Sequence, residues 1–275
     1  DVSGSPTLAG AGSGGRDAVM TMQWRSDAGL AGRVVVVTGA AGGIGRAVCA
    51  ALDEAGARVF AVDVDDTAVA SVLSELSGSG HAGGAFDLRD VSSHDEIFRQ
   101  AGELGEVAAL THLAAVLLRR DSVDDVTVED WDLQQEVNLK GTFFLNRAAY
   151  HVFVRQGTPG AIVNFTSQGW WTGGFGGSVA YAATKGGIVS MTRGFARSFA
   201  PAGVRVNAVA PGGVNTPMMW SGMTEESMAG FVSMIPLGRL AEPDELSGAV
   251  VFLASDAARY ITGAVVNVSG GQLMY

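Results

Sequence analysis

A tyrosine and a lysine four residues apart, Tyr181 and Lys185, are the residues best suited to chemistry, and Ser167 lies fourteen residues upstream of the tyrosine. On a helix, side chains at positions i and i+4 lie on one face about one turn apart. A lysine ammonium beside a phenol stabilises the phenolate and lowers the tyrosine pKa from its usual value of about 10. Such a tyrosine exchanges protons near neutral pH, as general acid–base catalysis requires. The pair by itself is also compatible with an ordinary surface helix.

A nucleotide-binding pattern lies far upstream of this pair. Residues 33–38 form a β-branched run typical of a strand buried on both faces. The glycine-rich residues 39–45, a helical stretch over 46–55 and a second strand over 58–62 follow, and the second strand ends on Asp63. A strand, a glycine-rich turn, a helix, a strand and an acidic residue form the βαβ unit that binds a dinucleotide.

The end of the second strand predicts which dinucleotide is bound. The glycines allow the backbone to approach the pyrophosphate at the positive end of the following helix. Asp63 follows Gly45 by eighteen residues, where a carboxylate accepts hydrogen bonds from the adenosine ribose. It would repel the 2′-phosphate of NADP, and Ala40, Ala41 and Val64 offer no basic side chain to receive that phosphate. The sequence therefore favours NAD over NADP as the cofactor.

Composition and charge limit the class of protein. The chain has 275 residues, 47% of them hydrophobic and 17% charged, which is enough for one globular α/β domain with a sizeable core. A net charge of -10 argues against nucleic-acid or membrane partners. Cys49 is the only cysteine and is expected in the core, and no apolar run is long enough to span a bilayer, so we expect a cytoplasmic protein. Residues 1–29, rich in Gly, Ser and Ala at their start, are expected to be a disordered leader or a cloning remnant before a domain over 30–275.

Strands and helices continue to alternate after this unit. The expected strands are 84–86, 107–113, 161–165, 204–209 and 264–268. The expected helices are 66–76 capped by Asp65, one capped by Ser92 and ending at Leu104, 127–155, 178–200 and 243–254. Such alternation predicts an α/β fold with a single Rossmann-type, doubly wound parallel sheet of about seven strands and helices on both faces.

With these motifs in order, residues 30–271 resemble the short-chain dehydrogenase/reductase family. Residues 38–45 match the family's Thr-Gly-x-x-x-Gly-x-Gly cofactor loop, and residues 211–216 its Pro-Gly segment beside the nicotinamide. The resemblance implies that Asn138, Ser167, Tyr181 and Lys185 are the catalytic residues. The implied cofactor-binding residues are Gly39, Gly43, Ile44, Gly45, Asp63, Asp87, Leu88, His112, Ala114, Tyr181, Lys185, Pro211, Gly212, Val214 and Thr216.

The resemblance also implies a role for each catalytic residue. Tyr181 exchanges a proton with the substrate oxygen while hydride moves between that carbon and the nicotinamide. Lys185 lowers the tyrosine pKa and binds the nicotinamide ribose, and Ser167 hydrogen-bonds the substrate oxygen. Asn138 holds a water that connects Lys185 to solvent.

One departure from the family pattern lies at the end of the fourth expected strand. The family usually has Asn-Asn-Ala-Gly there, and this chain has His-Leu-Ala-Ala over residues 112–115. No His, Cys or carboxylate near His112 has the spacing of a metal-ligand set, so no metal site is expected. We expect His112 to be a packed or hydrogen-bonded residue at the strand end. The interval between Ser167 and Tyr181 is about one residue longer than is common, which indicates an enlarged loop.

Two segments are expected to form the walls of the substrate site. Residues 168–177 form a glycine-rich loop with adjacent tryptophans, and residues 217–236 resemble the family's variable lid. Exposed aromatic side chains mark either a ligand contact or a subunit contact, and both remain open here. The candidate substrate residues are Gln168, Trp170, Trp171, Met218, Met219 and Trp220.

Three functions compete on this basis. The first is an NAD-dependent oxidoreductase acting on a secondary alcohol or ketone, with a small cyclic or polyhydroxylated substrate. The second is an acyl-thioester ketoreductase using NADPH. Binding a phosphopantetheine carrier requires a basic patch, and only Arg119 and Arg120 are candidates for one. The third is a cofactor-binding protein without catalysis, which the four catalytic residues argue against.

The sequence also predicts a homotetramer, with a dimer as the fallback. The helices expected over 127–155 and 178–200 carry apolar residues on more than one face. One apolar stripe can cover the sheet, and a second stripe exposed to water would form a large apolar patch. Packing of these helices on their copies would cover it, and residues 273–275 would add a second contact.

Overall fold

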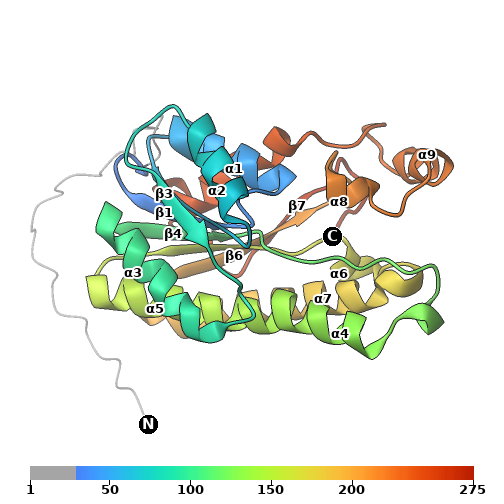
Figure 1. The fold of residues 1–275 in the computed structure, drawn as a ribbon, viewed down its shortest axis with the longest axis horizontal. Coiled ribbons are helices and arrows are strands. Elements are labelled where there is room, and N and C mark those ends of the chain that lie inside the picture. The colour runs from blue at the N-terminus through green and yellow to red at the C-terminus, as the bar shows by residue number, and fades with distance from the viewer. Residues whose placement is uncertain (1–28) are drawn as a thin grey trace, which may run out of the picture.

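The computed structural model describes residues 29–275, and its core is one parallel sheet (Figure 1). The leader predicted over residues 1–29 lies, apart from Gly29, outside the described residues. Seven strands pair in the order β3-β2-β1-β4-β5-β6-β7, all parallel, which confirms the predicted fold class. The strands are β1 (Val34–Thr38), β2 (Arg58–Asp63), β3 (Ala82–Ala85), β4 (Val107–His112), β5 (Ala161–Phe165), β6 (Arg205–Pro211) and β7 (Val265–Val268).

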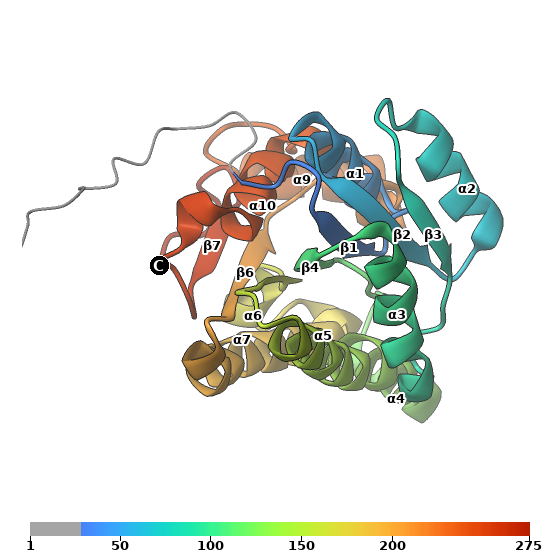
Figure 2. The same cartoon turned by 90° about the vertical axis from the view of Figure 1, so that its left-hand side faces the viewer.

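Helices cover both faces of the sheet (Figure 2). One face is packed by α1 (Gly43–Glu54), α2 (Asp66–Glu75) and α10 (Ser247–Ala254), and the other by α3 (His94–Leu104), α5 (Thr142–Gln156) and α7 (Val179–Phe199). Shorter helices lie in the connections: α4 (Val128–Gln134), α6 (Gly169–Thr172), α8 (Pro217–Trp220) and α9 (Glu225–Ser233). None of the helices in the described part of the chain could cross a bilayer.

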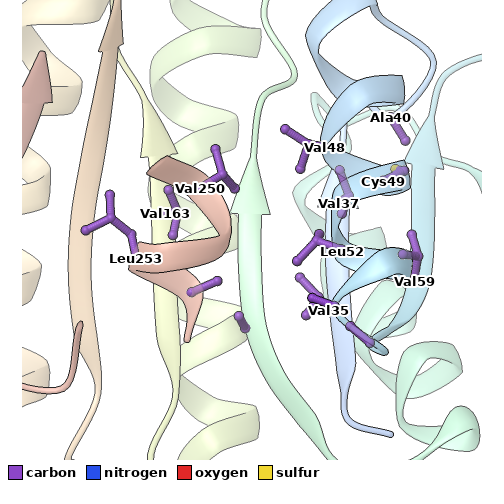
Figure 3. Close-up of a cluster of buried hydrophobic side chains, with 14 of the residues drawn as sticks. Val35, Val37, Ala40, Val48, Cys49, Leu52, Val59, Val163, Val250 and Leu253 are labelled. Atoms are coloured by element: carbon purple, nitrogen blue, oxygen red, sulfur yellow. The ribbon is translucent and has the colours of Figure 1, made fainter. Parts of the chain in front are cut away.

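The β-branched run of β1 explains why two cores form. Alternate side chains of a strand point to opposite faces of the sheet, so Val35 and Val37 join the core under α1, while Val34 and Val36 join the core under α3 and α5. All four side chains are fully buried. Cys49, expected in the core, is buried on α1 beside Val37 (Figure 3).

Several predicted boundaries need correction. The Asp65 cap of α2 is confirmed, because its carboxylate accepts hydrogen bonds from the amides of Thr67 and Ala68 at 2.9 and 3.1 Å. Ser92, predicted as the cap of α3, does not cap it. The carboxylate of Asp90 accepts from the Ser92 amide at 3.0 Å and from its hydroxyl at 2.6 Å, so a 3-10 turn precedes α3.

The helix predicted over residues 127–155 is also interrupted. Its central part, Gln135–Gly141, is a π-helical segment between α4 and α5. Asn138 lies in the middle of this segment and is fully buried. Such π-helical turns are frequent at functional sites. The similar helix predicted over 243–254 begins as a 3-10 turn (Pro243–Leu246) before α10.

Candidate active site

A cavity of about 930 Å³ opens at the carboxyl ends of the central strands. Its lining includes the residues that directly follow β1, β4 and β6, namely Gly39, Leu113 and Gly212, and Thr166 after β5. The chain runs from β1 toward β2 on one side and from β4 toward β5 on the other, so the cavity lies where the strand order reverses. Ligands of open α/β sheets bind at such a switch point.

The glycine-rich turn forms part of the lining of this cavity. Gly39 has φ of 68°, and a Cβ atom there would lie 2.7 Å from the amide nitrogen of Ala114. A Cβ atom on Gly45 would lie 2.0 Å from the carbonyl oxygen of Gly39. The backbone therefore folds tightly into α1, and residues 41–45 line the cavity at the positive end of this helix. A cradle of this kind fits the pyrophosphate of a dinucleotide.

Asp63 supports the glycine-rich turn from the end of β2. Its carboxylate accepts hydrogen bonds from the amides of Ala41 at 2.9 Å and Val64 at 2.8 Å. The sequence reasoning missed Arg46, whose Nε donates to the Ala41 carbonyl at 3.3 Å. Arg46 also forms an ion pair with Glu75 on α2 at 2.5 Å, so an acidic partner already holds the basic side chain closest to this turn.

Asp87 and Leu88, two of the implied cofactor-binding residues, lie outside the lining of the cavity. Asp87 accepts hydrogen bonds from the guanidinium of Arg89, and this interaction holds the pKa of the Asp87 carboxyl below its usual value. Leu88 is buried, with its carbonyl 3.1 Å from Nε2 of His94. The backbone of Ala114 packs against Gly39. This position fits a residue that contributes only its main chain to cofactor binding.

Three of the four predicted catalytic residues meet in the cavity. Ser167, two residues beyond β5, lines it together with Tyr181 and Lys185 of α7. Nζ of Lys185 donates a hydrogen bond to the carbonyl of Phe165 at 2.9 Å and lies 5.3 Å from the centre of the Tyr181 ring. The helical spacing of tyrosine and lysine thus places both at the end of β5.

Asn138 lies behind this group rather than in the cavity. Its side-chain amide donates to the carbonyl of Val116 at 2.8 Å, and its carbonyl oxygen accepts from the Val116 amide at 2.8 Å. The same amide donates to Thr184 Oγ1 at 3.3 Å, next to Lys185. Asn138 therefore joins the segment after β4 to α7, and the water relay proposed for it remains a prediction.

The residues that follow β6 lie beside the catalytic group, and the Gln168 amide donates to the Pro211 carbonyl at 3.0 Å. Pro211, Gly212, Val214 and Thr216 line it, as predicted for the nicotinamide segment. The Thr216 hydroxyl donates to the Val214 carbonyl at 3.3 Å and accepts from the Met219 amide at 3.3 Å, which caps α8. Among the described residues, no group of three or more His, Cys, Asp or Glu side chains could hold a metal ion.

Known proteins share this architecture. Residues 39–272 match the family model described as enoyl-(acyl carrier protein) reductase. The chain belongs to the short-chain dehydrogenase/reductase family. Over 248 residues it is 37% identical to D-threitol dehydrogenase of Mycolicibacterium smegmatis, with 88% of this chain and 93% of the relative covered. Over 255 residues it is 35% identical to (3R)-3-hydroxyacyl-CoA dehydrogenase of Canis lupus familiaris, with 89% and 98% covered.

A solved structure of the same family adds information on the cofactor. It is described as a candidate NAD(P)-dependent gluconate 5-dehydrogenase from Beutenbergia cavernae, with NADP bound at low occupancy. It is 36% identical to this chain with a TM-score of 0.83, and the match covers 90% of this chain and 98% of the other. As a member of the short-chain dehydrogenase/reductase family, the chain is an NAD(P)-dependent oxidoreductase acting on an alcohol or ketone group.

The electrostatics of the catalytic pair differ from the expectation. Burial raises the pKa of Tyr181 above its usual value, and the cation that opposes this effect is Arg119, not Lys185. Burial also lowers the pKa of Lys185 to about 7, because removal from water disfavours the ammonium. The predicted lowering of the tyrosine pKa by Lys185 is therefore wrong for the protein alone, because removal from water favours the neutral form of both groups.

The predicted substrate residues divide into two groups. Gln168, Met218 and Met219 line the cavity. The rings of Trp170 and Trp171 do not: they pack on Tyr275, with ring centres 5.1 and 5.7 Å away.

Trp220 also lies outside the cavity lining, and its indole nitrogen donates to Asn215 Oδ1 at 2.9 Å. The structure thus gives each of the three tryptophans a partner within the protein, and a substrate contact for them stays a prediction. Residues 273–275, predicted at a subunit contact, end in the tyrosine that packs on two of them.

His112 is hydrogen-bonded at the end of β4, as predicted. Its Nδ1 lies 2.7 Å from Thr38 Oγ1 and its Nε2 lies 2.7 Å from Thr142 Oγ1. The Thr142 hydroxyl donates its proton to the carbonyl of Asn138 at 2.6 Å, so it accepts from Nε2–H of His112. Nδ1 then accepts from the Thr38 hydroxyl. This chain of hydrogen bonds connects the cofactor turn after β1 to the π-helical segment that carries Asn138.

This arrangement predicts a pH-dependent stability. Burial lowers the pKa of His112 from 6.5 to about 3, so the folded protein keeps this imidazole neutral at pH values where the unfolded chain protonates it. The neutral imidazole makes its full contribution to the free energy of unfolding above pH 6.5. This contribution is lost as the pH falls toward 3, at about 1.4 kcal/mol per pH unit. We expect the free energy of unfolding of His112→Asn, measured with urea at several pH values, to fall less steeply as the pH is lowered than that of the parent. An equally steep fall in the variant would show that other groups cause the pH dependence.

Proposed function

We propose that the chain is an NAD-preferring dehydrogenase of a secondary alcohol, or a reductase of the corresponding ketone, with a small cyclic or polyhydroxylated substrate. One observation carries this proposal. One cavity is lined both by the glycine-rich turn, through Gly39 and residues 41–45, and by Ser167, Tyr181 and Lys185. A dinucleotide held at the turn would extend its nicotinamide toward these three side chains, and Thr216 offers a hydroxyl for its carboxamide.

Each catalytic side chain then has a task that follows from its chemistry. The bound dinucleotide supplies or accepts the hydride. Ser167 donates a hydrogen bond to the substrate oxygen and positions it beside Tyr181. Tyr181 gives a proton to this oxygen in reduction or takes one in oxidation. Lys185, with a pKa of about 7 and its Nζ 5.3 Å from the centre of the Tyr181 ring, can hold or release a proton beside the phenol.

The preference for NAD rests on Asp63 and on the partner of Arg46. Asp63 is held at the end of β2, beside the glycine-rich turn, by two backbone amides. A carboxylate fixed at this position would repel the 2′-phosphate of NADP. Arg46, the basic residue beside the turn, is engaged by Glu75 and by Ser71 at 3.3 Å. Receiving a 2′-phosphate would require Arg46 to leave these partners, which favours NAD.

An acyl-thioester ketoreductase is the second candidate, because several relatives are named for a hydroxyacyl-CoA or for an oxoacyl group on acyl carrier protein, and the matched family model is also named for acyl carrier protein. Two features weigh against it. Arg120, one half of the possible carrier patch, is held by Asp130 through two hydrogen bonds of 2.7 Å. Asp63 disfavours NADPH, the usual cofactor of that reaction. A role without catalysis is disfavoured because three catalytic groups converge on the cavity.

A homotetramer remains part of the proposal. A second hollow of about 540 Å³ lies between the π-helical segment, α5 and α7, and its lining is mostly apolar, with Leu139, Phe143, Phe144 and Met191 among its residues. Phe143 is 40% exposed in the single chain, so a copy of the same surface would bury it. We also propose a cytoplasmic location, with which the free, buried thiol of Cys49 is compatible.

Tyr181→Phe tests the assigned proton exchange. This substitution keeps the ring and removes the hydroxyl, so we expect turnover to fall by about 10²-fold or more while NAD still binds. Steady-state kinetics and a fluorescence titration with NADH measure the two effects separately. Tyr260→Phe is a matched control, because Tyr260 is fully exposed. Turnover within a few-fold of the parent would rule out the role of Tyr181.

Asp63→Ala tests the cofactor preference. We expect the parent to use NAD(H) with at least about tenfold higher kcat/KM than NADP(H), equal to about 1.4 kcal/mol. Removing the carboxylate should narrow this ratio, because the repulsion of the 2′-phosphate is gone. Glu75→Gln should narrow it further by releasing Arg46. A parent enzyme with equal use of both cofactors, or with a preference for NADP(H), contradicts the prediction.

The assembly is tested by light scattering. We expect a mass of four chains of 28.2 kDa at micromolar concentration, with two chains as the fallback. Phe143→Glu should shift the mass downward, because it places a charge in the apolar surface of α5. A parent mass equal to a single chain would contradict the proposal.

A further inference from the structure

The charge of the cavity is unlike the charge of the whole chain. The chain has a net charge of -10, yet the cavity lining contains Arg119, Arg120 and Lys185 and, among the described residues, no aspartate or glutamate. Two of these cations have partners that account for them. Asp130 forms a bidentate pair with Arg120, and Lys185 belongs to the catalytic group, with its pKa lowered to about 7.

Arg119 has no acidic partner among the described residues. Its side chain is half-buried on the segment that follows β4. Nη1 donates to the carbonyls of Met218 and Met219, both at 3.0 Å, and also to that of Ser221. These carbonyls belong to the predicted lid, so Arg119 joins the segment after β4 to the start of the lid. Nε and Nη2 donate to no described residue.

Arg119 lies on the substrate side of the cavity. It donates hydrogen bonds to carbonyls of α8 and of the turn that follows, and its positive charge lowers the pKa of the Tyr181 phenol. The glycine-rich turn, where the pyrophosphate is expected, makes no hydrogen bond with it among those of the described residues. Burial lowers the pKa of Arg119, but a guanidinium remains protonated at any pH the protein tolerates. A half-buried cation without a counterion is unfavourable until an anion pairs with it.

The geometry of a guanidinium limits which anion this is. Nε and Nη2 lie on one edge of the planar group and donate two parallel hydrogen bonds, which match the two oxygens of a carboxylate. We propose that the substrate is a small hydroxy- or oxo-carboxylate whose carboxylate pairs with Arg119 while its reacting oxygen lies at Ser167 and Tyr181. This inference rests on the proposed oxidoreductase function and specifies its substrate class.

Nη1 gives the same guanidinium a second task. An arginine that binds the lid through one nitrogen and the carboxylate through the others connects substrate binding to the position of α8 and of Met218 and Met219. A neutral polyol or ketone of the same size would leave the cation unpaired. The site therefore discriminates by charge as well as by shape.

Matched pairs of ketones test the inference. 3-Oxocyclohexanecarboxylate, 4-oxocyclohexanecarboxylate and 4-oxopentanoate are each compared with their primary amides, which have nearly the same shape and no charge, by following oxidation of NADH. We expect at least one carboxylate to exceed its amide by about 100-fold in kcat/KM. Arg119→Gln should reduce this ratio to within about threefold, and Arg119→Lys, which keeps the charge without the planar fork, should give an intermediate ratio. Arg197→Gln, an exposed change on α7 with the same loss of charge, should leave the ratio unchanged.

A binding measurement makes the test independent of turnover. Calorimetry of the protein with saturating NADH should show cyclohexanecarboxylate binding at least about tenfold more tightly than cyclohexanecarboxamide, and Arg119→Gln should remove the difference. Equal affinities in the parent, or an unchanged difference in Arg119→Gln, would overturn the inference. Tighter binding of cyclohexyl phosphate than of the carboxylate would assign the site to a phosphate instead and would also overturn it.

The two proposals can fail separately. Amides reduced as fast as carboxylates would leave the oxidoreductase function standing and reject the role of Arg119 in anion binding. Selective binding of carboxylates without reduction of any ketone would support Arg119 and reject the proposed chemistry. A thermal unfolding curve and an NADH titration of Arg119→Gln show whether this variant is folded. If it is not, Arg119→Lys and the parent binding data still decide the inference.

Discussion

The hydrogen bond from Nζ of Lys185 to the carbonyl of Phe165 sets where the chemistry can take place. It ties α7 to the last residue of β5, and a second bond, from the Thr166 hydroxyl to the Lys185 carbonyl at 2.8 Å, holds the same two elements together. Ser167 follows directly in the chain and Tyr181 lies one helical turn earlier on α7. The three catalytic side chains therefore have fixed positions relative to the edge of the sheet.

The same burial that fixes these groups also controls their charge. Lys185 is buried and Tyr181 is partly buried at the wall of the cavity, so each favours its neutral form in the protein alone. A neutral phenol is a proton donor, which suits reduction of a ketone. Positive charge brought to the cavity favours the phenolate, which suits oxidation of an alcohol. Arg119 already acts in this direction, so one cation influences both substrate binding and proton exchange.

Local patterns in the sequence predicted much of this structure. The β1 run, the Asp65 cap and the Tyr–Lys spacing depend on residues close in the chain, and the structure agrees with each. The π-helical segment at Asn138 was not predicted, because it accompanies hydrogen bonds to Val116, which lies on another segment.

Contacts distant in the chain account for the other omissions. Trp170 and Trp171 were named as candidate substrate residues, with a subunit contact left open, because the sequence does not show that the C-terminal Tyr275 packs on them. Arg119 was considered only as part of a carrier patch, because the carbonyls that orient it lie about one hundred residues away. Arg119 directly precedes Arg120, which has its own acidic partner, and the local sequence did not indicate a separate role for Arg119.

The pKa of Tyr181 tests the central claim most directly. Ultraviolet difference spectra of the parent against Tyr181→Phe isolate the ionisation of this phenol from the other three tyrosines. We predict that it ionises above the usual value of about 10 in the protein alone, because burial dominates, and at a clearly lower pH when NAD⁺ is saturating. Ionisation at the same pH with and without NAD⁺, or at an ordinary value in the protein alone, would contradict the account of a buried, cation-controlled proton donor.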